Sequence, residues 1–270
     1  MAHDQRLYVH GYHEREAERL QAQASSVLDL LHADTTYAAG SRVLEVGCGT
    51  GAQTVTLARN SPGARIISFD RSASSLAQAQ ARVAAAGFDN VEFHQADLFD
   101  LPFDTQSFDH VFVCFVLEHL SNPNEVLALL KTLLKPGGTI TVFEGDHGST
   151  FFHPDSKAAH QAITCLVELQ RRGGGNALIG RELYPLLAQA GFADVRVSPR
   201  IVYVDASRPE LVDGFTRKTF TAMIEGVREA AITAGLIDHA SFDAGIRALH
   251  RTTENDGVFC YTFFKGIGSN

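Results

Sequence analysis

A glycine-rich segment at residues 43–51 is the part of this chain best suited to hold a ligand. Its sequence, Val-Leu-Glu-Val-Gly-Cys-Gly-Thr-Gly, lies between a strand-like run and a helix-like run. Glycine lets the backbone turn sharply and lets a ligand approach it closely. Backbone amides at the start of a helix offer hydrogen-bond donors and a partial positive charge to an anionic group. The pattern therefore predicts a loop that binds a charged small molecule.

Two acidic residues follow the next two predicted strands. Asp70 ends the second strand and Asp97 follows the third. Open parallel sheets bind ligands outside the carboxyl ends of their strands, where an acid accepts hydrogen bonds from ribose hydroxyls. Asp97 is placed to accept from an adenine amine, with Leu98 beside the ring. The spacing thus predicts an adenosine site, with helix capping by Asp70 and a turn role for Asp97 as the alternatives.

The charge of the loop distinguishes between adenosine ligands. The glycines are spaced GxGxG, and Glu45 lies two residues before Gly47. A carboxylate there repels a pyrophosphate and attracts the ammonium and sulfonium groups of S-adenosylmethionine (SAM). The residues therefore favour SAM over a nicotinamide dinucleotide as the cofactor.

With these segments together, the chain resembles the class I SAM-dependent methyltransferases, especially the small-molecule group that contains the ubiquinone and menaquinone C-methyltransferases. The matching phrases are LEVGCGTG, the acid of SFDRS, QADLFDLPF with SFDHVF, LKPGGTITV, and LLAQAGF further on. The resemblance implies a Rossmann-like α/β fold, a doubly wound and mostly parallel seven-stranded sheet whose last strand, near residues 258–265, runs antiparallel.

The resemblance also implies which residues surround the cofactor. The acid and glycines of the first loop line its methionine end, the acid after the second strand binds the ribose, and the residues after the third strand meet the adenine. We expect these cofactor-binding residues to be Glu45, Gly47, Cys48, Gly49, Gly51, Asp70, Arg71, Asp97, Leu98 and Phe115. Phe115, or Val116 after it, borders the cofactor through its backbone. The alternative for Arg71 is a solvated surface residue. The alternative for Cys48 is a thiol buried in the core.

Two histidines follow strands and are candidates for catalysis. His147 follows the fifth predicted strand and His119 the fourth. Methyl transfer from a sulfonium is an in-line displacement, which needs a base only when the nucleophile carries a proton that must leave. Histidine titrates near neutral pH. We expect His147 to be the base, with Asp146 or Glu144 as orienting or substrate-contacting acids; the alternative is a turn role.

Two further features lie near these candidates. An aromatic stretch at residues 8–13 contains Tyr12, which we expect to close over the cofactor as a lid; the alternative is a segment that only packs before the following helix. Glu144 and Asp146 have the spacing of a pair of magnesium ligands, but the sequence offers no third ligand. We therefore expect no metal.

Composition limits the partners and the location. The chain has 270 residues and a net charge of -8, so its average surface repels RNA and DNA. The longest apolar run, residues 111–117, is too short to cross a bilayer. No signal peptide or paired CxxC cysteines are visible. These features predict a soluble cytoplasmic protein that acts on a small molecule, binds neither nucleic acid nor membranes, and has an undetermined oligomeric state.

Strand-like and helix-like segments alternate through the first half of the chain, which is typical of a parallel sheet. We expect strands at 42–46, 66–69, 91–94, 109–115 and 139–143, with helices between them, and a turn at 135–138. The second half predicts helices at 155–172, 181–190, 209–235 and 241–254. We expect a helical lid at 1–38, a SAM-binding core at 39–150, and a cap with the remaining strands at 151–270.

The sequence thus predicts an enzyme that transfers a methyl group from SAM to a small molecule by in-line displacement. Three alternatives stay open: a SAM-binding protein that does not methylate, such as a decarboxylase, a ring-forming enzyme or a regulator; an NAD-dependent oxidoreductase; and a methyltransferase for RNA or protein. The acceptor, the atom that is methylated and the use of a base are not determined by the sequence.

Overall fold

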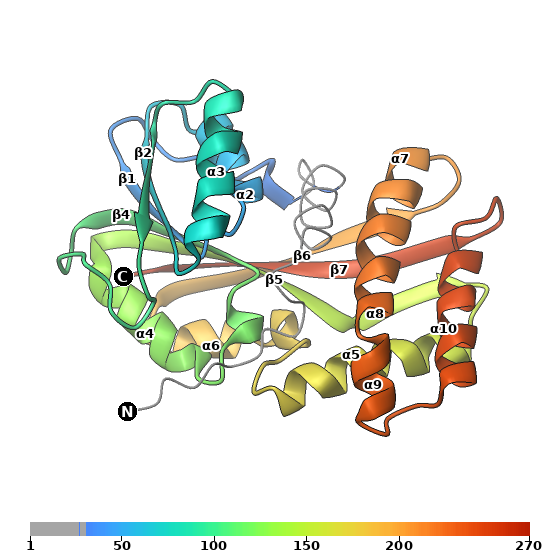
Figure 1. The fold of residues 1–270 in the computed structure, drawn as a ribbon. Helices are drawn as coiled ribbons and strands as arrows, with labels where there is room; N and C mark the ends of the chain where they lie inside the picture. The colour runs from blue at the N-terminus through green and yellow to red at the C-terminus, as the bar shows by residue number, and fades with distance from the viewer. Residues whose placement is uncertain (1–26, 28–30) are drawn as a thin grey trace. The chain divides into compact units, whose positions relative to one another are not determined.

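The computed structural model describes residue 27 and residues 31–270 (Figure 1). The chain forms two compact units. The larger unit comprises Leu28–Gly145, Ile179–Arg200 and Phe263–Asn270, and the smaller unit comprises Met1–Val27, Asp146–Leu178 and Ile201–Thr262. The predicted organisation into residues 1–38, 39–150 and 151–270 stays a prediction. The expected helical lid at residues 1–38 lies mostly outside the described residues.

Seven strands form one sheet in the order β3-β2-β1-β4-β5-β7-β6. The first five strands pair in parallel, which confirms the doubly wound, mostly parallel α/β fold. The strands are β1 (Arg42–Val46), β2 (Arg65–Asp70), β3 (Val91–Gln95), β4 (Phe108–Cys114), β5 (Leu134–His153), β6 (Ala193–Val204) and β7 (Val258–Ser269).

The strand order reverses between β1 and β4. β1 pairs with β2 on one side and with β4 on the other, so that Glu45 is opposite both Ser68 and Phe112. In an open α/β sheet a ligand crevice forms at such a reversal, outside the carboxyl ends of the strands. The glycine-rich loop directly follows β1 and therefore lies at this position.

The last strand runs antiparallel to its neighbour, as expected. Within the larger unit, Asn270 exchanges backbone hydrogen bonds with Gly137 and Gly138, near the start of β5. Phe263, at the other end of this part of β7, has its ring 5.5 Å from that of Phe115, which follows the end of β4. Since β4 and β5 are parallel, β7 runs in the opposite direction to both.

Helices connect the strands at the predicted places in the first half of the chain. α3 begins after Ser72, whose hydroxyl accepts a hydrogen bond from the Ser75 amide, and α4 begins with Pro123. The α-helices are α2 (Ala52–Asn60), α3 (Ala73–Ala85), α4 (Pro123–Leu133), α5 (Lys157–Arg172), α6 (Leu183–Gln189), α7 (Pro209–Leu211), α8 (Ala222–Gly226), α9 (Arg228–Thr233) and α10 (His239–Arg251). Short 3-10 helices occupy Leu117–His119 (η1) and Ile179–Glu182 (η2).

The segment expected to be helical at 209–235 is helical almost throughout, divided into α7, a π-helix at Val212–Thr221 (η3), α8 and α9. Val227 lies between α8 and α9, and its φ of -94° and ψ of 5° interrupt the helical repeat. One prediction is wrong in extent. The expected turn at 135–138 and the loop after residue 143 both belong to β5. His147 therefore lies inside a strand.

The core of the larger unit explains the apolar strands. Val111, Phe112 and Val113 of β4 are fully buried, as are Leu127 and Leu130 of α4. A parallel strand covered on both faces reads as a nearly continuous apolar run, and burial of such side chains stabilises the fold by about 1.5–3 kcal/mol each. This core holds the carboxyl ends of β1 and β4 at fixed spacing.

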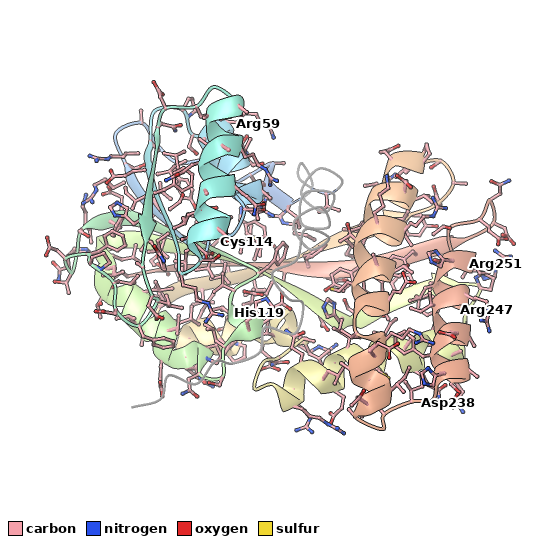
Figure 2. The ribbon with its side chains drawn as sticks, viewed as in Figure 1. Arg59, Cys114, His119, Asp238, Arg247 and Arg251 are labelled. Carbon is pink, nitrogen blue, oxygen red and sulfur yellow. The ribbon has the colours of Figure 1, made fainter. Side chains whose placement is uncertain are left out.

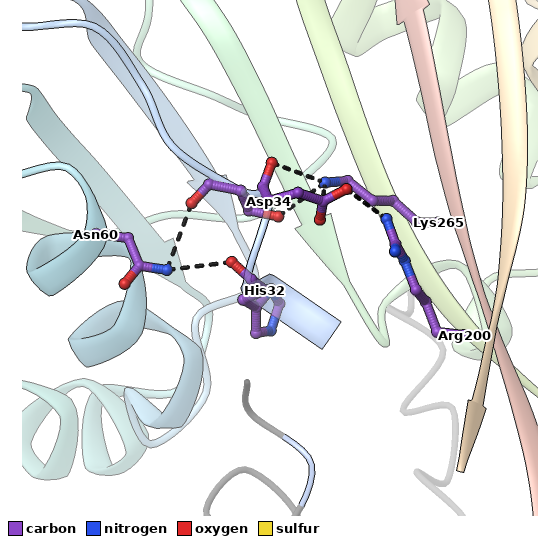
Figure 3. A network of polar contacts seen from close by, with 6 residues as sticks. His32, Asp34, Asn60, Arg200 and Lys265 are labelled. Carbon is purple, nitrogen blue, oxygen red and sulfur yellow. Dashed lines mark hydrogen bonds and ion pairs between the residues drawn. The ribbon is translucent and has the colours of Figure 1, made fainter. Parts of the chain in front are cut away.

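The segment before β1 is anchored in the larger unit by a polar network (Figure 3). The Lys265 ammonium donates to the Asp34 carboxylate at 2.8 Å and to the Thr35 hydroxyl at 3.0 Å, while Arg200 pairs with Asp34. Asn60 donates to the His32 carbonyl at 3.2 Å. Lys265 is 3% exposed, so its charge is compensated by these acceptors, as a buried ammonium requires.

Within the smaller unit, α5 and α10 pack closely. A Cβ atom at Gly245 of α10 would lie 2.6 Å from the Ala158 carbonyl oxygen and 2.7 Å from the Ala162 Cβ. Only glycine permits this approach. The two amphipathic helices therefore bury their apolar faces against each other, and Phe242, Leu166 and Ile163 are among the buried side chains.

Candidate functional site

The glycine-rich loop adopts a backbone that only glycine tolerates well. The φ angles of Gly47, Gly49 and Gly51 are 65°, 51° and 79°, in the left-handed region. A Cβ at Gly51 would lie 2.8 Å from the Ala79 Cα in α3, and one at Gly47 would lie 3.0 Å from a Val116 methyl. The loop is thus fixed by conformation and by close packing at the start of α2.

Asp70 connects this loop to the next strand. One oxygen of its carboxylate accepts from the Gly49 amide at 2.9 Å, and the other accepts from the Ser72 amide at 2.8 Å. The cap of α3 is Ser72, so Asp70 is not the N-cap residue that the alternative assumed. A carboxylate has about four acceptor positions, which leaves capacity for ribose hydroxyls. Arg71 beside it is exposed.

Glu45 lies deeper than its predicted role suggested. Its side chain is 2% exposed, and the Ser68 hydroxyl donates to it at 2.6 Å across the β1–β2 pair. Burial raises the pKa of Glu45 to about 7, because water no longer stabilises the charged form. At pH 7 this burial therefore partly neutralises Glu45. The charge of Glu45 was the reason for choosing SAM over a dinucleotide, so that argument is weaker than expected.

The residues after β3 form a tight turn. The Asp97 carboxylate accepts from the Phe99 amide at 2.9 Å, and the Asp100 amide donates to the Asp97 carbonyl at 3.0 Å. Leu98 packs against the core of the larger unit, whereas Asp97 is exposed. The turn role of Asp97 is thus present, and its adenine role stays a prediction.

The backbone is strained where β4 ends. Phe115 has a φ of 57°, which a bulky side chain rarely adopts, and its amide donates to the Phe143 carbonyl at 2.9 Å. Such outliers cost about 1–3 kcal/mol and cluster at ligand sites.

Two cysteines lie beside these loops. Cys114, the residue before Phe115, has a thiol whose pKa is raised by burial. Cys48, in the glycine-rich loop, is buried with Leu76 and Ala79, as a core thiol.

The turn that follows Phe115 is held by an acid of β5. The Glu144 carboxyl accepts from the Val116 amide at 3.0 Å and the Leu117 amide at 2.7 Å. Glu144 is fully buried, and burial raises its pKa well above the ordinary value, with the Glu118 charge adding to the effect. This carboxyl was expected to orient His147 or contact substrate; its hydrogen bonds to Val116 and Leu117 hold this turn.

His119 lies in η1, in the same turn (Figure 2). Its Nε2 is 3.6 Å from a carboxylate oxygen of Glu118, and both side chains are partly buried. His119 lies four residues after Phe115, in the larger unit, which also contains the glycine-rich loop. Its catalytic role stays a prediction.

His147 lies in the smaller unit and has an aromatic environment. It is 7% exposed, its Nδ1 is 2.7 Å from the Tyr261 hydroxyl of β7, and its ring faces Phe220 edge-on at 6.1 Å. The sequence analysis missed Tyr261. The only signal was the alternation of aromatic residues at 259, 261 and 263, which places them on one face of a strand but does not name their partner.

The remaining predicted site residues are Asp146 and Tyr12. Asp146 accepts from the Gly148 amide at 2.9 Å and so closes a local turn. Tyr12 lies outside the described residues. Among residues 27 and 31–270, no group of three or more His, Cys, Asp or Glu side chains is arranged to hold a metal ion. No helix in that same part of the chain is long and apolar enough to span a membrane.

The large apolar side chains of the smaller unit near His147 belong mostly to its core. Phe151 is 59% exposed, while Phe152, Phe215, Phe220, Met223 and Ile224 are at most 8% exposed. Phe215 and Phe220 pack against Phe259 and Tyr261 with ring centroids between 4.7 and 6.1 Å apart. Phe220 and Tyr261 of this group also contact the His147 ring.

Comparisons with known proteins extend these observations. A family model described as a methyltransferase domain matches residues 38–191, more than half of the chain. The demethylmenaquinone methyltransferase of Clavibacter sepedonicus is 42% identical over 106 residues, which cover 39% of this chain and 42% of that protein. This chain spans only 35% to 57% of the length of the first curated relatives that it matches.

Solved structures share the fold at low sequence identity. The cyclase SpnF is similar with a TM-score of 0.58 and 21% identity, over 92% of this chain and 81% of SpnF. Phosphoethanolamine N-methyltransferase 2 of Haemonchus contortus, in complex with S-adenosyl-L-methionine, is similar with a TM-score of 0.57 and 17% identity, over 93% of this chain and 56% of that one. At these identities the likeness concerns the fold alone.

Proposed function

Because this chain belongs to the methyltransferase domain family, we propose that it transfers a methyl group from S-adenosyl-L-methionine to a small-molecule acceptor. The observation that carries the proposal is the 2.9 Å hydrogen bond from the Gly49 amide to Asp70. It joins the glycine-rich loop to the acid of β2, beside the point where the strand order reverses. That is the place where a doubly wound sheet binds a nucleoside.

We assign the cofactor to the larger unit. The backbone amides at the start of α2 bind the carboxylate of the methionine part, and Asp70 accepts from the ribose hydroxyls. Asp97 and Leu98 meet the adenine, while the backbone of Phe115 borders the methionine part. Bound cofactor supplies an electrophilic methyl group on a sulfonium, and the protein holds the acceptor in line with it.

For acceptors that carry a proton on the nucleophile, we propose His147 as the general base. Its hydrogen bond with Tyr261 supports this role, because it fixes the orientation of the ring, and in the tautomer whose Nδ1 donates to the hydroxyl Nε2 is the basic nitrogen. The buried aromatic residues around it exclude water from such a transfer. His119, 3.6 Å from Glu118, is the second candidate.

We further propose that the acceptor is a small molecule and that the enzyme acts in the cytoplasm. The similarity to a demethylmenaquinone methyltransferase and the net charge of -8 support a small acceptor over a nucleic acid. The four cysteines are all free thiols, which is typical of a reducing compartment.

Calorimetry tests the cofactor assignment. We expect SAM and S-adenosylhomocysteine to bind with micromolar dissociation constants, and Asp70→Ala to weaken this binding at least tenfold. The matched control is Asp104→Ala, which removes an exposed carboxylate from the same unit. A folded wild-type protein that binds neither ligand contradicts the proposal.

Release of S-adenosylhomocysteine during incubation with quinol, phenol and amine acceptors then separates methyl transfer from cofactor binding without transfer.

A further inference from the structure

The carboxyl of Glu144 holds the turn after β4, although it belongs to the neighbouring strand. β4 and β5 are paired in parallel, with Cys114 opposite Phe143, so Glu144 lies at the level where the chain leaves β4. Its Oε1 accepts from the amides of Val116 and Leu117 at 3.0 and 2.7 Å. One side-chain oxygen therefore fixes two successive peptide groups.

This turn is in contact with the glycine-rich loop. A Cβ built on Gly47 would lie 3.0 Å from the Cγ2 of Val116, so the Val116 side chain closes directly over that glycine. Phe115, one residue earlier, is held at a φ of 57° while its amide bonds to Phe143. A displacement of the turn would therefore alter both the strained residue and the packing of the loop.

The two oxygens of Glu144 have different roles. Oε1 accepts both amides, whereas Oε2 is buried and has no hydrogen-bond partner among the described residues. A neutral carboxyl has this asymmetry, with a carbonyl oxygen that accepts and a hydroxyl oxygen that carries the proton. Burial and the Glu118 charge raise the pKa of Glu144, in agreement with the neutral form. Glutamine has nearly the same shape and the same accepting oxygen.

We propose that Glu144 is a positioning residue of the methyl-transfer site: it holds the backbone of residues 115–117 against the glycine-rich loop and so sets the affinity for the cofactor. The inference rests on the proposed SAM-dependent function. Glu144 acts through the peptide groups of the turn, and the turn carries the backbone that we assign to the methionine part of the cofactor.

Three variants test this role by calorimetry with S-adenosylhomocysteine as the ligand. Glu144→Gln keeps the accepting oxygen, so we expect its dissociation constant to stay within threefold of wild type. Glu144→Leu removes the acceptor and leaves two buried amides unpaired, so we expect binding to weaken at least tenfold. Ile140→Ala, on the same strand and fully buried, is the matched control, which lowers the melting temperature without altering affinity.

The outcomes separate positioning from general loosening of the fold. Tight binding by folded Glu144→Leu overturns the proposal, as does a tenfold loss in Glu144→Gln or an equal loss in Ile140→Ala. If Glu144→Leu does not fold, Glu144→Asp carries the same test, because its shorter side chain withdraws the oxygen from the amides. Failure of the wild-type protein itself to bind the ligand contradicts the proposed function instead.

Discussion

The two units of this molecule place their functional groups by different means. In the larger unit, Asp70 and Glu144 accept hydrogen bonds from main-chain amides, so strand ends and tight turns fix the candidate cofactor site. In the smaller unit, His147 is held by another side chain, the Tyr261 hydroxyl, and by aromatic rings. The glycine-rich loop and Asp70 could be predicted from sequence motifs, whereas contacts between separate strands, such as Glu144 with the turn after β4 and His147 with Tyr261, could not.

The largest expected effect is on the rate of methyl transfer, from a substitution at His147 in the smaller unit. If His147 is the base for a hydroxyl or acidic carbon acceptor, His147→Gln lowers the rate of methyl transfer by about 10²–10⁴-fold, because a positioned base contributes that much. The rate of S-adenosylhomocysteine formation measures it. The affinity for S-adenosylhomocysteine should not change, since we assign that ligand to the larger unit; a parallel loss of both contradicts the separation of roles.

The next largest expected effect is on ligand affinity, from a substitution in the glycine-rich loop of the larger unit. Gly51→Ala forces a Cβ to within 2.8 Å of the Ala79 Cα at a φ of 79°. We expect binding of S-adenosylhomocysteine to weaken by about 100-fold, that is, about 3 kcal/mol. Gly87→Ala is the matched control, because its φ is 76° but its Cβ would contact nothing within 4 Å. Equal losses in the two variants would show that strain, and not the packing of the loop, explains the effect.

Burial of Glu45 predicts a pH dependence of stability. Its pKa is about 7 in the folded protein and 4.5 ordinarily, so the folded state binds more protons between these values. The free energy of unfolding therefore falls as the pH rises from about 4.5 to about 7, by roughly 3 kcal/mol at most. Urea unfolding at several pH values measures this slope.

Glu45→Gln should flatten that slope relative to wild type, because the amide does not titrate. The exposed Glu125→Gln serves as the control and should leave the slope as it is. A wild-type slope that persists in Glu45→Gln would mean that other groups of the larger unit bind the protons. His32, whose pKa burial lowers from 6.5 to about 4, contributes a slope of the opposite sign over an overlapping pH range, so the difference in slope between wild type and Glu45→Gln is the quantity that reports Glu45.

The smallest effect is expected for the partner of His147. Tyr261→Phe removes the hydroxyl that lies 2.7 Å from Nδ1 and should lower the rate of methyl transfer about tenfold, with a shifted pH–rate profile. The ring remains, so packing against Phe220 is kept. Tyr184→Phe, at a 58% exposed position, is the control. A Tyr261→Phe enzyme with the wild-type rate and profile would exclude the hydroxyl from orienting His147.

Local sequence predicted most of the larger unit correctly. The strands expected at residues 42–46, 66–69, 91–94 and 109–115 are found at Arg42–Val46, Arg65–Asp70, Val91–Gln95 and Phe108–Cys114, because their apolar runs and bounding turns are short-range signals. The prediction was wrong for β5, which continues to His153 through residues expected to form a loop. Pairing with neighbouring strands decides where a strand ends, and that information is not in the segment itself.

The amino-acid sequence was enough to predict the fold class, the glycine-rich loop after the first strand and the acids near the next two strand ends, because each depends on local sequence or on the order of the elements. Only the tertiary structure decided that Glu144 bonds to the turn after β4, that Glu45 is buried beside Ser68, and that His147 meets Tyr261. These contacts join residues on separate strands. Their partners and pKa values depend on burial and register, which arise only when the strands assemble.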